Sequence, residues 1–263
     1  MEWFLRPKRG PTKGERMNDY ETREPLSSMC YWWPRLLRCD VPQPQTVEVM
    51  NPLTRRECVE IGSGECETVP QAWTRLMSAL SISAMSFTEP FFLRTDVLSG
   101  KHFFVDTCYV QNRNRLSFHV QQLLETAECA DMMGFPTKAF YIRKYIQPFA
   151  AFRAFKGFPV AKEWRVFIRD GLVECAHFYW PEETIMRADL PNWKELLQHL
   201  QQVDDRVEAC RLATLVGREF REGFWSVDVM FAADGSPWVI DMADGERSFH
   251  DECETRKARG ETP

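Results

Sequence analysis

Long apolar runs are missing from this 263-residue sequence, and their absence limits where the protein works. A helix that crosses a bilayer needs ~20 consecutive apolar residues, and no segment approaches that length. The first residues, MEWFLRPKRGPTKGER, also lack the apolar core of a secretory signal peptide. We therefore expect no membrane partner and a cytoplasmic location.

Patterned cysteines are missing as well. The nine cysteines are scattered singly, no Cys-x-x-Cys pair occurs, and the five histidines show no metal-ligand spacing. This pattern predicts reduced thiols rather than a disulfide framework or a zinc site. No convincing Ser/His or Cys/His arrangement and no Lys-x-Asp-Gly motif provides a covalent nucleophile, so a nucleotidyltransferase or nucleic-acid ligase ranks low.

Charge of one sign is not in large excess. The 33 basic and 38 acidic residues leave a net charge of -5, which argues against nucleic acid as the main partner, although a local basic groove stays possible. The length and the 44% hydrophobic content suffice for one sizeable domain, or for one domain with a smaller partner.

Composition and turn residues divide the chain into four regions. Residues 1–28 are polar and charged and predict a flexible tail, within which Met17 is a second candidate start. Residues 29–90 are expected to form a small N-terminal region, 91–248 the main domain, and 249–263 a C-terminal tail.

Hydrophobic periodicity predicts mixed helices and strands. The expected helices are 31–37, 71–85, 117–133 and 193–221, the last broken near residues 204–205. The expected strands are 46–50, 91–97, 103–110, 140–146, 163–169, 172–179 and the two strands of a hairpin at 224–244. Segment 51–70 is expected to be irregular, and segment 149–162 is expected to be a connection that carries Arg153 and Lys156.

The hairpin at 224–244 is the most informative stretch. Asp234-Gly235 favours a two-residue turn, and counting outward from it places Asp228 directly opposite Asp241. Facing side chains lie roughly 5 Å apart, so the two carboxylates need a cation, or one must hold a proton. Oxygen ligands suit Mg²⁺, particularly with phosphates completing its shell. The alternative is that both aspartates lie at strand edges in water.

A short loop at 98–102 carries Ser99, Gly100 and Lys101 between two expected strands. It is not a P-loop, because Thr95 and His102 occupy the positions where that motif has glycine and Ser or Thr. Its backbone N–H groups and lysine could still cover phosphates. The alternative is an exposed hairpin turn.

The order of these pieces resembles the ATP-grasp fold over residues 91–248. The segments FLRTDVLSGKH (92–102), YIRKYI (141–146), KEWRVFIRDG (162–171), WSVDV (225–229) and VIDMADG (239–245) are most similar to small ATP-grasp proteins of actinobacteria and their phages. They resemble the eukaryotic cell-division-cycle assembly factors more distantly. The resemblance implies an α+β fold in which two subdomains, each containing an antiparallel sheet, clasp ATP.

The resemblance also implies roles for individual residues. Arg94 would contact the α- and β-phosphates, Ser99, Gly100 and Lys101 would cover the β- and γ-phosphates, and Glu163 would bind the ribose hydroxyls. The backbone of a hinge would read adenine, and its residues are Arg143, Lys144, Tyr145 and Ile146.

Asp228 and Asp241 match the two magnesium ligands of the family, and Arg165 and Lys101 its catalytic cations. Many ATP-grasp ligases have asparagine two residues after the second acid, where this chain has Ala243. Asp244 could supply the missing oxygen if the strand bends.

The implied function is a Mg-ATP-dependent carboxylate–amine or carboxylate–thiol ligase that works through an acyl phosphate. Its cofactors would be ATP and Mg²⁺. Its substrates would be a small carboxylate and an amine, or a peptide or protein acceptor. The alternative is an ATP-binding assembly or chaperone-like factor that ligates nothing.

Overall fold

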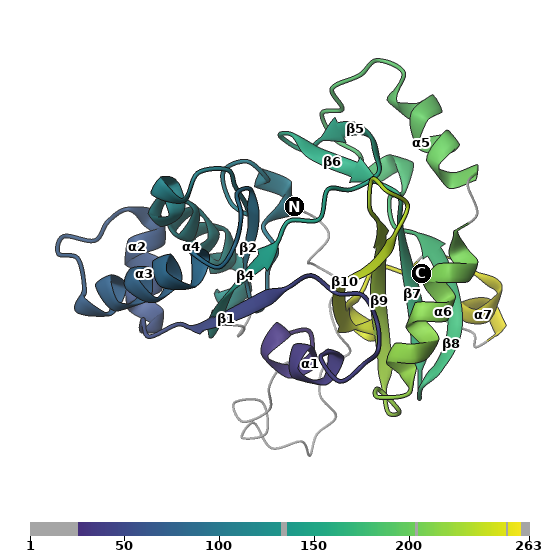
Figure 1. Cartoon of the computed structure of the whole chain (residues 1–263), viewed down its shortest axis with the longest axis horizontal. Coiled ribbons are helices and arrows are strands. Elements are labelled where there is room, and N and C mark those ends of the chain that lie inside the picture. Colours follow the sequence, from purple (N-terminus) through teal and green to yellow (C-terminus); the bar gives the residue numbers. More distant parts are fainter. Residues whose placement is uncertain (1–25, 133–135, 203–204, 251, 259–263) are drawn as a thin grey trace.

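The computed structural model describes residues 26–132, 136–202, 205–250 and 252–258. Figure 1 shows two lobes, one built around β1, β2 and β4 and the other around β7 to β10. Most of the predicted tail at 1–28 and the end of the chain at 259–263 lie outside the described residues. No helix in the described ranges has the length and apolar character needed to cross a membrane.

The first lobe is a four-stranded antiparallel sheet with helices packed on it. Its strand order is β1 (Thr46–Met50), β4 (Ala139–Lys144), β2 (Phe91–Thr95) and β3 (Tyr109–Val110). The helices are α2 (Arg55–Ser63), α3 (Gln71–Ala84) and α4 (Leu116–Met132). Leu76, Leu80 and Leu123 are buried between helices and sheet, so the apolar stripes of α3 and α4 form this core.

The second lobe is another four-stranded antiparallel sheet, ordered β10 (Pro237–Asp244), β9 (Phe224–Phe231), β7 (Glu163–Arg169) and β8 (Leu172–Phe178). Helix α6 (Arg206–Gly217) packs on one face through Leu212 and Val216. Helix α1 (Met29–Leu36) adds Trp32 to the same core. Because β1 joins the first sheet and α1 the second core, residues 29–90 contribute to both lobes and build no separate core.

A smaller third unit lies beside the second sheet. It pairs β5 (Ala150–Ala154) with β6 (Phe158–Ala161) and packs α5 (Trp193–Gln202) against them. Segment 149–162, expected only as a connection, therefore forms a hairpin. The remaining elements are short: η3 (Lys101–Phe103), η4 (Arg113–Arg115), η5 (Glu182–Thr184), η6 (Gly245–Arg247) and α7 (Glu254–Ala258).

Two expectations were wrong for local reasons. Helix α2 lies in the segment expected to be irregular, because Thr54 and Glu57 form a capping box and Gly64 ends the helix in the left-handed region. The strand expected at 103–110 shrinks to β3, because η3 and the turns after it occupy its first part. The predicted helix at 193–221 is divided into α5 and α6, as the aspartates near 204–205 indicated.

The predicted pairing of Asp228 with Asp241 is confirmed, although the path to it differs. Ala232 pairs with Ser236, so the turn has three residues instead of two. A bulge between Val239 and Asp241 then shifts the register by one residue. The extra turn residue and the bulge shift the strand register by one residue in opposite directions. The two aspartates therefore face each other, as the two-residue turn had predicted.

A close backbone contact joins α6 to the turn between β7 and β8. A Cβ atom on Gly217 would lie 2.3 Å from the carbonyl oxygen of Gly171, which has a φ of +82°. We expect Gly217→Ala to lower the free energy of unfolding by about 1–3 kcal/mol in urea denaturation, because the helix or the turn must move.

Thr214→Ala, an exposed site one turn earlier, is the matched control and should change stability by only ~0.5 kcal/mol. Alanine favours a helix over glycine by about 1 kcal/mol, so a stabilised Gly217→Ala chain would contradict this close contact.

Candidate functional site

A cleft between the two sheets holds most of the predicted site. It encloses about 750 Å³ of empty space, its open mouth included. Ten of the thirteen predicted site residues line it: Arg94, Ser99, Lys101, Arg143, Lys144, Tyr145, Ile146, Glu163, Asp228 and Asp241. Since these residues come from both lobes, only the folded chain brings them together.

Arginines neutralise the two facing aspartates. Arg165 on β7 donates from Nε and Nη2 to the two carboxylate oxygens of Asp228, each at 2.8 Å. Arg94 on β2 lies 2.8 Å from Asp241 through Nη1. Burial alone would raise the pKa of Asp241, but Arg94 and then Arg143 bring that pKa below its ordinary value. Both carboxylates thus lie next to cations.

Arg143 differs most from its predicted role. We expected the hinge to act through its backbone, but the Arg143 side chain is buried and crosses to the other sheet. Its Nη1 donates to the carbonyl oxygen of Ile240 at 2.6 Å, at the bulge of β10. Burial, followed by the nearby charge of Arg94, lowers the pKa of Arg143 to about 10. The side chain therefore adds a positive charge to the cleft and links the two lobes.

The loop carrying Lys101 is packed rather than exposed. Gly100 has a φ of +68°, and its carbonyl oxygen accepts a 2.6 Å hydrogen bond from Thr107 Oγ1. A Cβ on Gly100 would lie 2.8 Å from Leu123 of α4, so glycine is needed there. This packing argues against a simple exposed turn.

Lys101 reaches the second lobe. Its Nζ contacts the hydroxyl of Tyr179 and lies 4.0 Å from the centre of the Tyr179 ring. Burial disfavours the charged amine, but Tyr179, then Glu163 and Asp228, overcome it, so the pKa of Lys101 is raised. Lys101 is therefore a stable cation at the centre of the cleft.

Glu163 lies at the start of β7, buried beside these charges. Burial raises its pKa to about 8; Lys101 opposes this rise and Asp228 adds to it. Near neutral pH the carboxyl group is therefore largely protonated and can donate a hydrogen bond as well as accept one.

An apolar wall completes the cleft, and the sequence reasoning missed it. Its larger members are Phe92, Phe104, Phe158, Met230 and Ile240. A usable signal was strand alternation, because Phe92 lies two residues before Arg94 and Met230 two after Asp228.

Three predicted residues lie outside the lining. Gly100 lies in the loop but packs against Leu123 of α4. Arg165 adjoins the cleft through its pairing with Asp228. Asp244 pairs with Trp225 in the sheet, accepts a hydrogen bond from the Glu246 amide and lies 3.6 Å from Arg247. Alternation thus places Asp244 on the opposite face from Asp241, and only two of the three predicted metal ligands meet.

Comparison with known proteins supports the architecture. No family model and no curated protein matches this sequence. Cdc123 from Schizosaccharomyces pombe shares 8% identity, with 90% of each chain covered and a TM-score of 0.55. A RimK-domain ATP-grasp protein from Sphaerobacter thermophilus shares 13% identity over 89% of this chain and 63% of its own, with a TM-score of 0.46.

N5-carboxyaminoimidazole synthase from Aspergillus clavatus, solved with ADP and 5-aminoimidazole ribonucleotide, shares 13% identity. The match covers 86% of this chain but 45% of that one, with a TM-score of 0.46. The chain thus spans less than two thirds of the length of these last two proteins. The fold is α+β, with two antiparallel sheets that enclose a cleft, as predicted, and it resembles the fold of Cdc123. The narrower resemblance to actinobacterial and phage proteins stays a prediction.

The raised pKa of Glu163 gives a pH dependence with a definite sign. Between about pH 4.5, its ordinary value, and about pH 8, the folded chain holds a proton that the unfolded chain has released. Relative to Glu163→Gln, the free energy of unfolding of the wild type should therefore fall as pH rises through this window, by at most about 1.4 kcal/mol per pH unit.

Urea denaturation at several pH values measures the difference between the two chains. Glu183→Gln, at an exposed position, is the control and should show no such trend. A difference between wild type and Glu163→Gln that is constant from pH 5 to 8 would contradict the raised pKa.

Proposed function

We propose that the cleft binds Mg-ATP and uses it to activate a carboxylate. The observation that carries the proposal is the charge of the cleft. Four cationic side chains line it, Arg94, Lys101, Arg143 and Lys144, and Arg165 adjoins it. Against them, among the described residues, stand Asp228, Asp241 and a largely protonated Glu163. Such an excess of positive charge suits a polyphosphate.

The acidic pair fits a magnesium ion by its donor chemistry. Asp228 and Asp241 present carboxylate oxygens from facing strand positions, and Mg²⁺ is commonly held by one or two carboxylates plus phosphates. The ion would bridge phosphate oxygens and neutralise their charge. Arg94 pairs with Asp241 and Arg165 with Asp228. Phosphates held near the two aspartates would therefore also lie near these two arginines.

The adenine base of ATP would lie against the apolar wall. Phe92, Met230 and Ile240 line the same cleft as Lys144 to Ile146, and they would contact the faces of adenine. Backbone groups after Lys144 would hydrogen-bond its edge. Protonated Glu163 would pair with a ribose hydroxyl.

The reaction we propose is ligation through an acyl phosphate. The γ-phosphoryl group passes from ATP to a substrate carboxylate, and an amine or thiol then attacks the acyl carbon and releases phosphate. Lys101 and Arg165 would stabilise the charge on the transferred group and on the departing ADP. This chemistry needs positioning and charge stabilisation, which agrees with the lack of a nucleophile motif.

A second candidate is an ATP-binding assembly factor that does not ligate. The observation favouring it is the donor set: Ala243 stands where many ligases have asparagine, and Asp244 faces away. Of the three predicted metal ligands, only Asp228 and Asp241 then remain in the cleft, and both are paired with arginines. Such a site would suit holding ATP better than turning it over.

Nucleotide binding is tested by thermal unfolding with and without Mg-ATP. A ligand at ~100 times its Kd should add roughly 2.7 kcal/mol of stability, seen as a higher midpoint. Lys101→Gln and Asp241→Asn should each lose most of this shift relative to their own nucleotide-free midpoints. Lys194→Gln, far from the cleft on α5, is the control and should keep it. Equal midpoint shifts in the wild type and in all three variants would contradict nucleotide binding in this cleft.

Turnover separates the two candidates. A ligase should release phosphate from Mg-ATP only when a carboxylate and an amine are both supplied, so we would screen amino acids and small amines in pairs. Lys101→Gln should reduce any such release at least tenfold, and Lys194→Gln should not change it. A full thermal shift without phosphate release across the screen would favour the assembly factor.

A further inference from the structure

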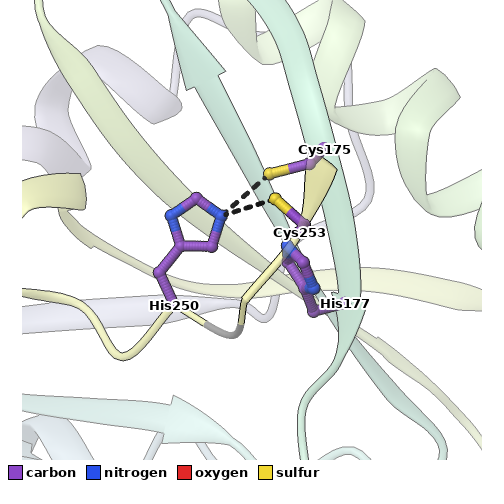
Figure 2. Close-up of side chains that lie close together, drawn as sticks. All are labelled: Cys175, His177, His250 and Cys253. Atoms are coloured by element: carbon purple, nitrogen blue, oxygen red, sulfur yellow. Dashed lines mark hydrogen bonds between the residues drawn. The ribbon is translucent and has the colours of Figure 1, made fainter. Parts of the chain in front are cut away.

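Two cysteines and two histidines from distant parts of the sequence meet on the edge strand of the second sheet. Cys175 and His177 are two residues apart on β8, and His250 and Cys253 follow β10 after η6. Their four candidate ligand atoms all lie within 4.8 Å of one another. Figure 2 shows the four side chains converging, with the His250 ring pointing at both sulfur atoms.

The distances match one tetrahedral site. Nε2 of His250 lies 3.0 Å from Sγ of Cys175 and 3.6 Å from Sγ of Cys253. Zn–S bonds of about 2.3 Å and Zn–N bonds of about 2.0–2.1 Å place tetrahedral ligand atoms about 3.3–3.8 Å apart. The side chains thus need only small rotations to surround one ion.

The donor atoms select the metal. Two thiolates and two imidazoles form the Cys₂His₂ set that structural zinc sites use, and Mg²⁺ prefers oxygen ligands instead. The four residues are partly buried and lie beside aromatic rings. His250 stacks on buried Phe167 with ring centres 3.9 Å apart, and His177 meets Phe167 edge-on. An apolar shell of this kind limits water access to a bound metal.

We propose that Cys175, His177, His250 and Cys253 form a structural Zn²⁺ site that fastens the C-terminal segment to β8. This segment is described at residues 248–250 and 252–258. The expectation of no metal-ligand spacing failed to detect the four residues, because 73 positions separate His177 from His250 and each pair alone is a weak signal. The local patterns are Cys175-x-His177 and His250-x-x-Cys253.

The attachment of the C-terminal segment also affects Arg165, which adjoins the cleft. His177 is the cross-strand neighbour of Arg165, so the zinc site and the arginine that binds Asp228 share one face of the sheet. The carbonyl oxygen of Phe249, next to His250, accepts a 3.5 Å hydrogen bond from Arg165 Nη1. Zinc would therefore fix the segment that contacts this guanidinium.

Hydrogen bonds also hold the segment. Ser248 Oγ lies 2.7 Å from Ser226 Oγ, and Thr255 Oγ1 donates to the carbonyl of Glu174 at 3.5 Å. Phe249 is 38% exposed, so most of its surface is covered. Metal ligation would add strong, directional bonds to these contacts.

The first test is metal content and cobalt spectroscopy of the full chain without nucleotide, so its outcome is independent of the proposed function. The chain, expressed with zinc and purified under reducing conditions, should carry one equivalent of Zn²⁺ by elemental analysis. After removal of the metal, Co²⁺ titration should give the visible absorption of a tetrahedral site and thiolate-to-cobalt charge-transfer bands, saturating at one equivalent.

Substitutions assign the ligands. Cys175→Ser and His250→Gln should each lose the stoichiometric zinc and the tetrahedral cobalt spectrum. Cys66→Ser and His199→Gln, outside the cluster, are the matched controls and should keep both. If a ligand variant fails to fold, the cobalt titration of the wild type decides without it. A wild type that takes up neither metal at one equivalent, or ligand variants that retain zinc, would overturn the site.

Limited proteolysis tests the fastening. Trypsin cleavage near Lys257 should be several-fold faster in the zinc-free chain than in the zinc-loaded chain, while cleavage elsewhere stays similar. Equal rates at Lys257 in the two forms would show that the metal does not hold the C-terminal segment.

Discussion

The ion pair between Arg94 and Asp241 is the interaction on which the rest of the site depends. Arg94 belongs to the first sheet and Asp241 to the second, and the arginine side chain is almost wholly buried. Arg143 strengthens the same junction through the carbonyl of Ile240. Breaking one partner would leave a buried charge without compensation, which costs far more than a surface pair contributes. The cleft is thus held in shape by the same charges that would bind its ligand.

The arginines of the cleft balance the charge of its two facing aspartates. The hairpin of β9 and β10 brings Asp228 and Asp241 face to face, and Arg165 and Arg94 each pair with one of them. The remaining acid, Glu163, has no arginine of its own, and burial therefore raises its pKa. The net excess of positive charge suits a polyanionic ligand, and it is the reason why we propose that the cleft binds a nucleotide.

The second lobe carries two chemically different regions on one sheet face. Arg165 and Asp228 lie toward the cleft, and Cys175 and His177 lie toward the free edge of β8. Hard oxygen ligands and phosphates suit Mg²⁺, and sulfur with imidazole suits Zn²⁺. The two regions could bind different ions without competition, and the C-terminal segment, which contacts Arg165 through Phe249, is the physical connection between them.

Local patterns in the sequence by themselves determined most of the helices and most of the long strands. The facing of Asp228 and Asp241 was predicted from a two-residue turn, whereas the structure reaches it through a three-residue turn and a compensating bulge. Turn chemistry and strand alternation act over a few residues, so they can be read without the fold. The tertiary structure alone decided which cations neutralise the aspartates, where the Arg143 side chain points, and that Cys175 and His177 meet His250 and Cys253. Those outcomes depend on contacts between residues far apart in the chain, whose approach is set by the packing of two sheets and of the C-terminal segment rather than by any local pattern.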